Sequence, residues 1–382
     1  MDQQVPQIQK AAVIENPGQS AKIRIRDDVP VGEPGENQVL VKLAFSGICG
    51  SEIRAFLGWS QYNSIVGHEG VGVVVKTGDQ VATSMLGQRV GVKWVFSACD
   101  RCSICQKGLQ NNCPNQLNTG RHVPGTLQQY VVADARFVTR IPDDVPSEVA
   151  APLLCAGLTM AGALSKLDAH LSNDDWVVIS GSGGGLGHLG VQLAARLRGF
   201  RVIAVDSGEA KRDLSLSCGA QFFVDFATED VEKKVKELTG EGAHAVLVVS
   251  GSQEAFRVAP QLVRNTGLIV TIGLPSNDFN IPIPASLCSA RALTVTGVAT
   301  GTEDQMQELL AHVGTGKISP VVAVVEFSEI PAIFDKLKGD SIVGRMVEHF
   351  CLRSNEVSDD GSLSKRFLKE AKEAHVLQEL RL

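Results

Sequence analysis

The chain has 382 residues, of which 44% are hydrophobic and 20% are charged, and its formal net charge at pH 7 is −6. These values are ordinary for a globular protein, and the length predicts two domains that each have a core. The chain lacks the excess of basic residues that nucleic-acid binding needs, and no apolar run approaches the roughly 20 residues that cross a bilayer. We therefore expect neither a nucleic-acid partner nor a membrane span.

The cysteine content points to a reducing compartment. The sequence contains nine cysteines, and its start, M-D-Q-Q-V-P-Q-I-Q-K, has no charged segment followed by an apolar one. Disulfides are rare in reducing interiors, where clustered cysteines more often serve metal binding or catalysis. We expect a cytoplasmic protein.

Short β-rich runs punctuated by Gly and Pro fill residues 11–141, including 39–45, 71–76 and 127–132. This pattern predicts a β-rich, barrel-like lobe. Within it, the run S-E-I-R-A-F-L predicts a short helix capped by Ser51, which places Cys49 just ahead of the helix start.

The loop 97–113 carries four cysteines with the spacing C-x2-C-x2-C-x7-C, at Cys99, Cys102, Cys105 and Cys113. A tetrahedral zinc ion needs four thiolates at about 2.3 Å, and closely spaced cysteines on a polar turn can supply them. The alternative is a pair of disulfides, which needs an oxidising compartment. The spacing favours a structural zinc site, which is closed and performs no chemistry.

Residues 147–168 are rich in Ala and Leu at helical spacing and predict a bridge into a second domain. From Trp176 the chain alternates continuous apolar strands with helices, as in W-V-V-I-S, R-V-I-A-V-D and L-I-V-T-I-G. This alternation is typical of a doubly wound parallel sheet that helices cover on both faces. After Leu293 we expect two more strands and helices near 304–313 and 329–338. Residues 352–382 are polar and charged, which favours a solvated tail over a helix that binds a partner.

The second domain opens with a glycine-rich loop, I-S-G-S-G-G-G-L-G-H-L-G, between a strand and a helix. Glycines at such a turn allow close approach of a pyrophosphate to the helix N-terminus. The strict G-x-G-x-x-G is absent because Ser182 occupies the first glycine position, so the loop alone is also compatible with mere flexibility. The residues that we expect to contact a dinucleotide here are Gly181, Ser182, Gly183, Gly184, Gly185, Leu186 and Gly187.

Asp206 ends the next strand, about twenty residues after the glycines. A carboxylate there accepts hydrogen bonds from the adenosine ribose and repels a 2'-phosphate, so it favours NAD over NADP. Lys211 follows five residues later and is expected near the same ribose. Taken singly, Asp206 could be a turn residue and Lys211 a solvated lysine.

Three residues outside the cysteine loop are further candidates for metal binding: Cys49, His68 and Cys155. Read individually, the cysteines could be buried thiols and the histidine a core residue. As a set, two cysteines and one histidine leave a tetrahedral zinc ion with one open position, which suits catalysis.

The combination of motifs resembles the zinc-containing medium-chain alcohol dehydrogenases, and most of all the fungal NAD-dependent type. The likeness runs over roughly residues 10–350 and rests on C-G-S-E, G-H-E-G-V-G-V-V-V, the four-cysteine loop, T-L-Q-Q-Y, L-C-A-G-L-T, G-G-L-G and I-V-G-R, in this order. It implies an α/β protein in which a GroES-like catalytic domain (1–156) is followed by a Rossmann NAD-binding domain (157–297), a return to the catalytic domain (298–350) and a tail (351–382). It also implies a homo-oligomer, by analogy a tetramer.

The resemblance also implies roles for individual residues. A catalytic zinc held by Cys49, His68 and Cys155 would act as a Lewis acid while hydride passes to or from NAD. The further roles implied are Glu69 as a carboxylate beside the metal, Ser51 as a proton relay (or only a helix cap), Arg345 as a contact of the cofactor phosphates and Ile272 as a backbone contact near the nicotinamide.

Two residues depart from the family pattern. Glu52 stands where an aspartate usually orients the zinc-bound histidine, and Arg54 stands where many relatives have a histidine that passes the proton to solvent. A guanidinium stays protonated at neutral pH and cannot act as that base, so Arg54 is expected to help hold the cofactor phosphates instead.

The loop between Cys49 and His68 looks short, and Trp59, Trp94 and Leu274 resemble walls of the substrate pocket.

The sequence thus predicts a zinc-dependent oxidoreductase that interconverts a primary or secondary alcohol and its aldehyde or ketone with NAD(H). A specialised biosynthetic carbonyl reductase of the same family is an alternative. A zinc-free quinone or enoyl reductase is disfavoured, because the four-cysteine loop and Cys49 are present. A nucleotide-binding relative without activity is a further, less favoured alternative, because a fold does not by itself specify a function.

Overall fold

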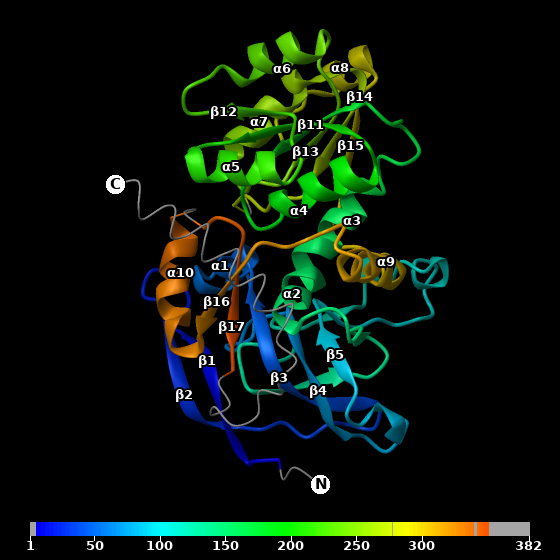
Figure 1. Ribbon diagram of the computed structural model, residues 1–382. Coiled ribbons are helices and arrows are strands. Elements are labelled where there is room, and N and C mark those ends of the chain that lie inside the picture. The colour runs from blue at the N-terminus through cyan, green and yellow to red at the C-terminus, as the bar shows by residue number, and fades with distance from the viewer. Residues whose placement is uncertain (1–4, 277, 340–341, 351–382) are drawn as a thin grey trace.

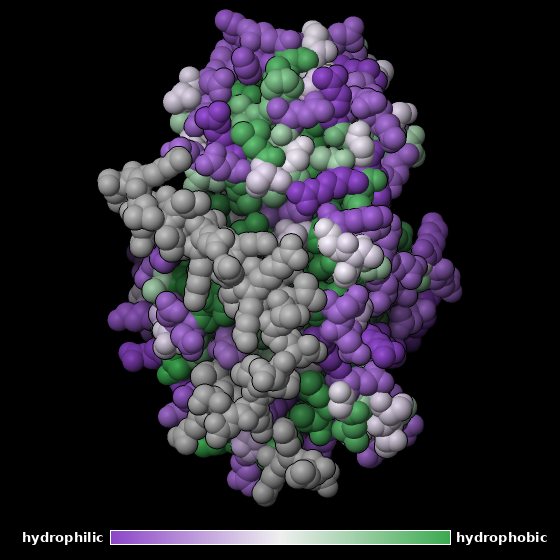
Figure 2. Space-filling model, in the orientation of Figure 1, coloured by the Kyte–Doolittle hydropathy of each residue, from purple (hydrophilic) through white to green (hydrophobic). Residues whose placement is uncertain are grey.

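The computed structural model describes residues 5–276, 278–339 and 342–350, which form two lobes joined by a helical bridge (Figure 1). The predicted solvated tail lies outside the described residues. On the face shown in Figure 2, polar side chains dominate the outer margin of the upper lobe.

The lower lobe is built on a seven-stranded sheet in the order β16-β17-β3-β4-β5-β9, with β8 paired to β3. Its strands are β3 (Gln38–Ile48), β4 (Gly70–Thr77), β5 (Arg89–Val92), β8 (Tyr130–Asp134), β9 (Thr139–Arg140), β16 (Val322–Glu326) and β17 (Arg345–His349). Two antiparallel pairs accompany it, β1 (Ile8–Glu15) with β2 (Lys22–Pro30) and β6 (Val95–Ser97) with β7 (Leu117–Asn118). The predicted β-rich lobe is confirmed.

Short turns of helix connect these strands and bring polar residues to their ends. They are η1 (Gly50–Glu52), α1 (Ile53–Phe56), η2 (Thr83–Met85), η3 (Cys105–Lys107) and η4 (Gln110–Asn112).

The upper lobe is a parallel sheet in the order β12-β11-β10-β13-β14-β15, the order of a doubly wound dinucleotide-binding fold. Its strands are β10 (Trp176–Ser180), β11 (Arg201–Asp206), β12 (Phe222–Asp225), β13 (Ala243–Val248), β14 (Val263–Thr271) and β15 (Thr294–Gly297). The helical segments of this lobe are α4 (Gly187–Gln192), η6 (Leu193–Leu197), α5 (Glu209–Ser217), α6 (Val231–Thr239), α7 (Gln253–Leu262) and α8 (Ala285–Arg291). Every residue of β10 is buried, as expected of a central strand covered on both faces.

A helical bridge links the lobes: α2 (Ser147–Pro152), the π-helical turn η5 (Leu153–Gly157) and α3 (Leu158–Leu164). The largest core cluster runs along it, with Val71 from the lower sheet, Leu154 from the bridge and Leu189 from the upper lobe. The stretch Ser147–Leu164 has 18 residues and a mean hydropathy of 1.4, enough by length and composition alone to cross a membrane. Because 72% of it is buried inside the protein, packing between the lobes explains its apolar character.

After β15 the chain returns to the lower lobe through α9 (Glu303–Gly314), β16, η7 (Phe327–Glu329), α10 (Ile330–Lys338) and β17. In Figure 1, β16, α10 and β17, drawn in orange, lie beside the early strands drawn in blue, and β17 pairs directly with β3. The two predicted helices are confirmed, whereas the prediction of two strands after Leu293 was one strand short. Both β15 and β16 are short and largely exposed, so their apolar patterns are weak.

Candidate functional site

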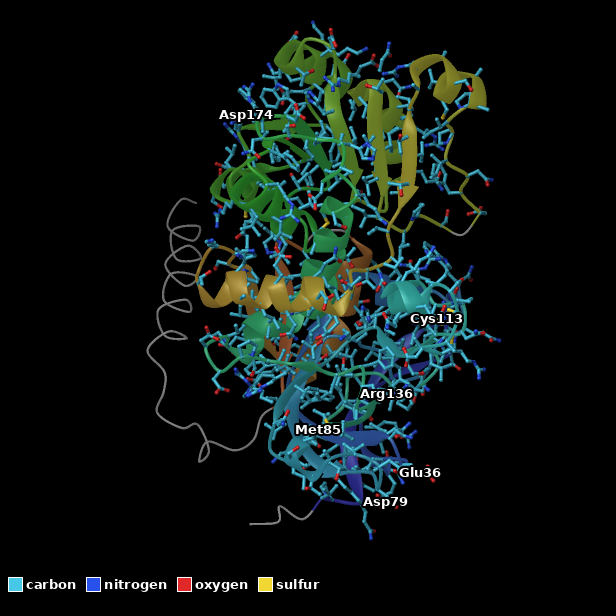
Figure 3. All side chains as sticks on the ribbon, turned by 90° about the vertical axis from the view of Figure 1, so that its right-hand side faces the viewer. Glu36, Asp79, Met85, Cys113, Arg136 and Asp174 are labelled. Carbon is cyan, nitrogen blue, oxygen red and sulfur yellow. The ribbon has the colours of Figure 1, made fainter. Side chains whose placement is uncertain are left out.

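The four-cysteine loop folds into one compact cluster, near the labelled Cys113 in Figure 3. The Sγ atoms of Cys99 and Cys105 are 4.0 Å apart, and those of Cys99 and Cys113 are 3.5 Å apart. Thiolates bound tetrahedrally to one zinc ion at about 2.3 Å lie about 3.8 Å from one another. The described cysteines are all free, so the loop contains no disulfide and its donor set fits zinc.

Backbone donors support thiolate charge in this loop. The N–H of Cys105 donates to Cys102 Sγ at 3.4 Å. Hydrogen bonds from the backbone of Arg101 and Cys102 lower the pKa of Cys99 to about 6, whereas burial raises the pKa of Cys105 to about 12. The cluster can therefore bind a cation, whose charge compensates the Cys99 thiolate.

Cys49, His68 and Cys155 come together although they lie far apart in the sequence. The two Sγ atoms are 3.8 Å apart, and His68 Nε2 lies 3.2 Å from Cys155 Sγ. With a carboxylate oxygen of Glu69 they form a group whose possible ligand atoms lie within 4.8 Å of one another. These separations match a tetrahedral zinc ion with S and N donors, so this second donor set also fits the metal.

Two strand ends and a helical turn position these side chains. Cys49 follows β3 directly, His68 precedes β4, and Cys155 lies on the π-helical turn η5, a feature that is frequent at functional sites. Gly67 has a φ of +100°, and a Cβ there would lie 2.6 Å from Thr126 Oγ1. Only glycine fits this tight approach, which turns the chain so that His68 faces the two thiols.

The site is buried and rich in groups that can carry negative charge. Cys49 and His68 are 4% and 3% exposed. A hydrogen bond from Cys155 lowers the pKa of Cys49 well below its usual value. Burial alone would lower the pKa of His68, but the Cys49 thiolate, Glu52 and Glu69 raise it to about 9. Such surroundings favour a cation, which a bound metal supplies.

Glu69 pairs with Arg345 at the bottom of this cluster. The Arg345 guanidinium donates to the Glu69 carboxylate, and both side chains are buried. Burial raises the pKa of Glu69 to about 7 although Arg345 opposes the rise. Because Arg345 Cδ would lie 2.7 Å from a Cβ at Gly185, this arginine touches the glycine loop as well as the candidate metal site.

Ser51 lies within η1, and its Oγ donates to Cys49 Sγ at 3.2 Å. Neither η1 nor α1 has a side-chain cap, so the prediction that Ser51 caps a helix was wrong. The N-cap position of η1 is Cys49, so Ser51 lies inside the turn and its hydroxyl bonds to the candidate metal ligand instead.

Arg54 reaches across to the upper lobe, where its Nη1 donates to the backbone oxygen of Pro275 at 2.9 Å. Its guanidinium also lies 5.8 Å from the ring centroid of Trp59. Of the expected pocket walls, Trp94 packs edge-on against His68 with ring centroids 5.2 Å apart, while Leu274 is 55% exposed next to Pro275.

The glycine loop joins β10 to α4 as predicted. Gly187 packs against the start of the loop, where an added Cβ would lie 2.0 Å from Gly181 O. Ser182 is buried and its hydroxyl lies 2.8 Å from that of Ser215, so it packs against α5. This explains how a serine is tolerated at the first position of the motif.

Asp206 and Lys211 meet beside this loop. Asp206 Oδ2 accepts from the N–H of Gly183 at 2.9 Å, and Lys211 Nζ lies 3.1 Å from Asp206 Oδ1. Ile272 follows β14, and its N–H donates to Val248 O at 3.0 Å. The carboxylate is thus held at the strand end that dinucleotide-binding folds use for the ribose.

Sequence reasoning missed two buried groups near the site. His188 of α4 bonds to Gly184 O and accepts from the N–H of Val321, and Glu348 of β17 is 0% exposed. In the sequence, His188 is only one polar residue within the glycine-rich motif, so nothing there signals its buried contacts. The signal for Glu348 is an acidic residue in M-V-E-H, a strand that otherwise reads as core.

A doubly wound nucleotide-binding lobe, a β-rich lobe and two zinc-type clusters together define a zinc-dependent dehydrogenase. Comparison with family patterns agrees: residues 35–143 match the alcohol dehydrogenase GroES-like domain, and residues 185–315 match the zinc-binding dehydrogenase domain.

Individual relatives are similar over nearly the whole chain. Alcohol dehydrogenase 2 of Emericella nidulans is 40% identical, with 90% of this chain and 98% of the relative covered. An alcohol dehydrogenase of Schizosaccharomyces pombe is 37% identical with the same coverage. The solved acetophenone reductase of Geotrichum candidum in complex with NAD superposes with a TM-score of 0.80 at 29% identity, with 91% and 98% of the two chains covered.

The chain belongs to the zinc-containing medium-chain alcohol dehydrogenase family. By homology it is an NAD-dependent zinc alcohol dehydrogenase, with an α/β fold of a GroES-like part and a Rossmann-like sheet.

Proposed function

We propose that Cys49, His68 and Cys155 hold the catalytic zinc, and that Cys99, Cys102, Cys105 and Cys113 hold a structural zinc. The observation that carries the assignment is the convergence of the first set from three distant segments to within 4.8 Å. The set offers three strong ligands, because the nearby Glu69 is engaged by Arg345. Three protein ligands leave the fourth position for substrate, whereas four cysteines close the loop site.

We also propose a division of the chain into a catalytic domain (1–156), a NAD-binding domain (157–297), a return to the catalytic domain (298–350) and a tail (351–382). The pairing of β17 with β3 supports the return, because it completes the lower sheet with late residues. The two ranges matched by family patterns fall on either side of the helical bridge.

The residues around the site supply positioning and proton transfer. When bound, zinc supplies a Lewis acid for the substrate oxygen and NAD supplies a hydride acceptor. The Ser51 hydroxyl, next to Cys49, is placed to take the proton of an alcohol and pass it on. Arg54 cannot continue this relay as a base, so the proton leaves through the cofactor ribose or water.

For the cofactor, we propose that Gly181, Ser182 and the residues to Gly187 form the phosphate cradle. Asp206 accepts from the ribose hydroxyls, and Lys211 supports that carboxylate. Arg345 contacts the cofactor phosphates beside Gly185, and Ile272 offers its carbonyl to the nicotinamide.

The substrate we propose is a primary or secondary alcohol, or the corresponding aldehyde or ketone, that is small or flat. Trp94 packs against His68, so an aromatic ring narrows the space beside the candidate metal. Trp59 and Leu274 are exposed enough to form further walls. A specialised biosynthetic carbonyl compound of this shape fits the same walls.

We propose further that the enzyme acts as a homo-tetramer in the cytoplasm. The tetramer rests on the resemblance to fungal alcohol dehydrogenases alone, and the free cysteines of the described residues support a reducing compartment.

The test is the initial rate of NADH oxidation over a panel of aldehydes and ketones, with NADPH and zinc-depleted protein measured in parallel. We expect turnover with NADH, much less with NADPH, and loss of turnover on zinc removal that zinc restores. Folded protein that retains both zinc ions and turns over no member of the panel would contradict the proposal.

A further inference from the structure

A row of aromatic rings leads from the candidate metal site toward the surface. Trp94 packs edge-on against His68 with ring centroids 5.2 Å apart, and the ring of Tyr62 lies 6.4 Å from that of Trp94. The guanidinium of Arg121 lies over the Tyr62 ring, with Cζ 5.7 Å from the ring centroid. Burial decreases along this row, from the buried His68 to the exposed Arg121. The row therefore runs outward from the candidate metal ligand.

The turn that carries Arg121 is fixed against the same site. The N–H of Thr119 donates to Trp94 O at 2.9 Å. Gly120 has a φ of +78°, and a Cβ there would lie 2.8 Å from the backbone oxygen of Gly67, which directly precedes the candidate histidine ligand. Because Arg121 follows Gly120 directly, hydrogen bonding and close packing of the backbone hold this arginine near the site.

The Arg121 guanidinium has donors to spare. Arg136, Arg201 and Arg257 also lie over aromatic rings, and each of them donates to an acidic or amide side chain. The side chain of Arg121 forms neither a hydrogen bond nor an ion pair with any residue in the part of the chain that the structure describes. Contact with a ring face holds a guanidinium in place without using its five N–H groups. Arg121 is therefore prepared to bind a planar anion.

The ring beneath this guanidinium is itself held in place. Tyr62 is half-buried and packs against the apolar cluster that includes Ile48 and Val66. Burial raises the pKa of Tyr62, although the charges of Arg121 and Arg54 oppose the rise. Two cations thus act on the space around this ring, which favours a negatively charged group there.

A carboxylate is the anion that fits one guanidinium best. Its two oxygens match the planar fork of an arginine, and its single negative charge is balanced by one such group. A phosphate dianion would need a second cation in direct contact, and Arg54 already donates to the backbone oxygen of Pro275. The flat rings of Trp94 and Tyr62 between the candidate metal ligand and Arg121 suit a flat molecule.

We propose that Arg121 is a specificity-determining residue, which binds the carboxylate of a flat substrate whose alcohol or carbonyl group lies at the candidate metal site. This inference rests on the proposed function and names its substrate class: aromatic aldehydes, ketones and alcohols that carry a carboxylate on the ring. Trp94 and Tyr62 line the path between the two ends of the substrate, and Tyr62 holds the guanidinium in place. Arg121 contacts the end of the substrate that does not react, so it acts mainly on KM.

The test compares carboxybenzaldehydes with methylbenzaldehydes of similar shape, each as the 3- and the 4-isomer, using the zinc-loaded full chain and NADH. We expect the parent to prefer the carboxylate of the better isomer pair. In Arg121→Gln the ratio of kcat/KM for carboxylate over methyl compound should fall about tenfold, mainly through KM, as expected for one lost hydrogen-bonded contact to a charged group. Arg121→Lys keeps the charge without the planar fork and should retain part of the preference.

The matched control is Arg26→Gln, which removes one positive charge from the exposed strand β2. Its ratio of carboxylate over methyl compound should equal that of the parent. Arg121 is exposed, so its replacement should leave the fold intact. Equal ratios in the parent and R121Q would overturn the proposal, as would a parent that turns over the methyl compounds and rejects the carboxylates.

A second measurement does not need turnover. Calorimetric titration of the zinc- and NADH-loaded chain with 4-carbamoylbenzoate and 4-methylbenzamide, which do not react, compares the affinities of the parent and R121Q. The parent should bind the carboxylate about tenfold more tightly than R121Q does, and this difference should shrink as the ionic strength rises. Equal affinities would overturn the proposal. A parent that turns over no aldehyde contradicts the proposed function, while the calorimetric comparison still tests Arg121.

Discussion

The two cysteine clusters differ in how their members are brought together. The four cysteines of the first cluster belong to one loop, and its outermost members, Cys99 and Cys113, lie 14 positions apart. In the second cluster, Cys49 and Cys155 lie 106 positions apart. The loop cluster is partly exposed and packs against little more than Phe137 and Ala98. The second cluster lies between β3, β4 and the helical bridge, next to the largest core of the protein.

The two clusters therefore depend to different degrees on the rest of the chain for their order. A short loop with four thiols is ordered by its metal, so binding free energy is folding free energy there. The second cluster, which we propose to be catalytic, is ordered by the packing of both lobes, and a metal bound there would add chemistry to a frame that already exists. Loss of metal should therefore change mainly local stability at the first site and mainly activity at the second.

The largest effect is expected at the loop. Cys113→Ser removes a buried thiol of the proposed structural site, and a structural zinc ion contributes about 10 kcal/mol or more to the order of such a loop. We expect the variant to lose one zinc ion per chain and to melt at a clearly lower temperature in calorimetry. Cys288→Ser on α8 is the matched control, because Cys288 lies outside both clusters. Unchanged zinc content and melting temperature in the Cys113 variant would contradict a structural site.

The second-largest effect is expected mainly on activity, at the second cluster. Cys155→Ser should lower kcat/KM at least about a thousandfold, because the metal supplies several kcal/mol of stabilisation in the transition state. One zinc ion per chain is lost, and the melting temperature changes much less than in Cys113→Ser. The same Cys288→Ser protein is the control for both assays. If Cys155→Ser lowers stability as strongly as the loop variant, the contrast between the clusters is wrong.

The same contrast explains what the sequence can predict. Cysteine spacing within one loop indicates the first cluster directly, and the alternation of strands and helices indicates the parallel sheet. The second cluster required resemblance to a family, because no local pattern connects His68 with Cys155. Ser51 was misread as a cap, since its neighbour Cys49 is close only once the turn η1 is formed.

The smallest expected effect concerns His188, at the contact between the two lobes. His188 is 0% exposed and joins the glycine-rich turn to the segment that leads into β16. Its Nδ1 lies 3.0 Å from Gly184 O, and its Nε2 accepts from the N–H of Val321 at 3.1 Å, which requires a neutral ring. Burial lowers the pKa of His188 from 6.5 to about 4, although the bond to Gly184 opposes the shift and the nearby Arg345 adds to it.

A histidine with a lowered folded-state pKa stabilises the fold fully above its unfolded pKa of 6.5, and this contribution is lost as the pH falls toward 4. The loss amounts to roughly 3 kcal/mol, because each pKa unit corresponds to about 1.4 kcal/mol. His188→Gln keeps one donor and one acceptor but does not titrate, so the free energy of unfolding should fall less steeply between pH 6.5 and 5 than in the parent. Urea unfolding at several pH values measures both slopes. Equal slopes would show that this joint between the lobes does not titrate. A steeper slope in the parent would place this acid sensitivity at His188, in the contact between the glycine-rich turn and the segment that leads into β16.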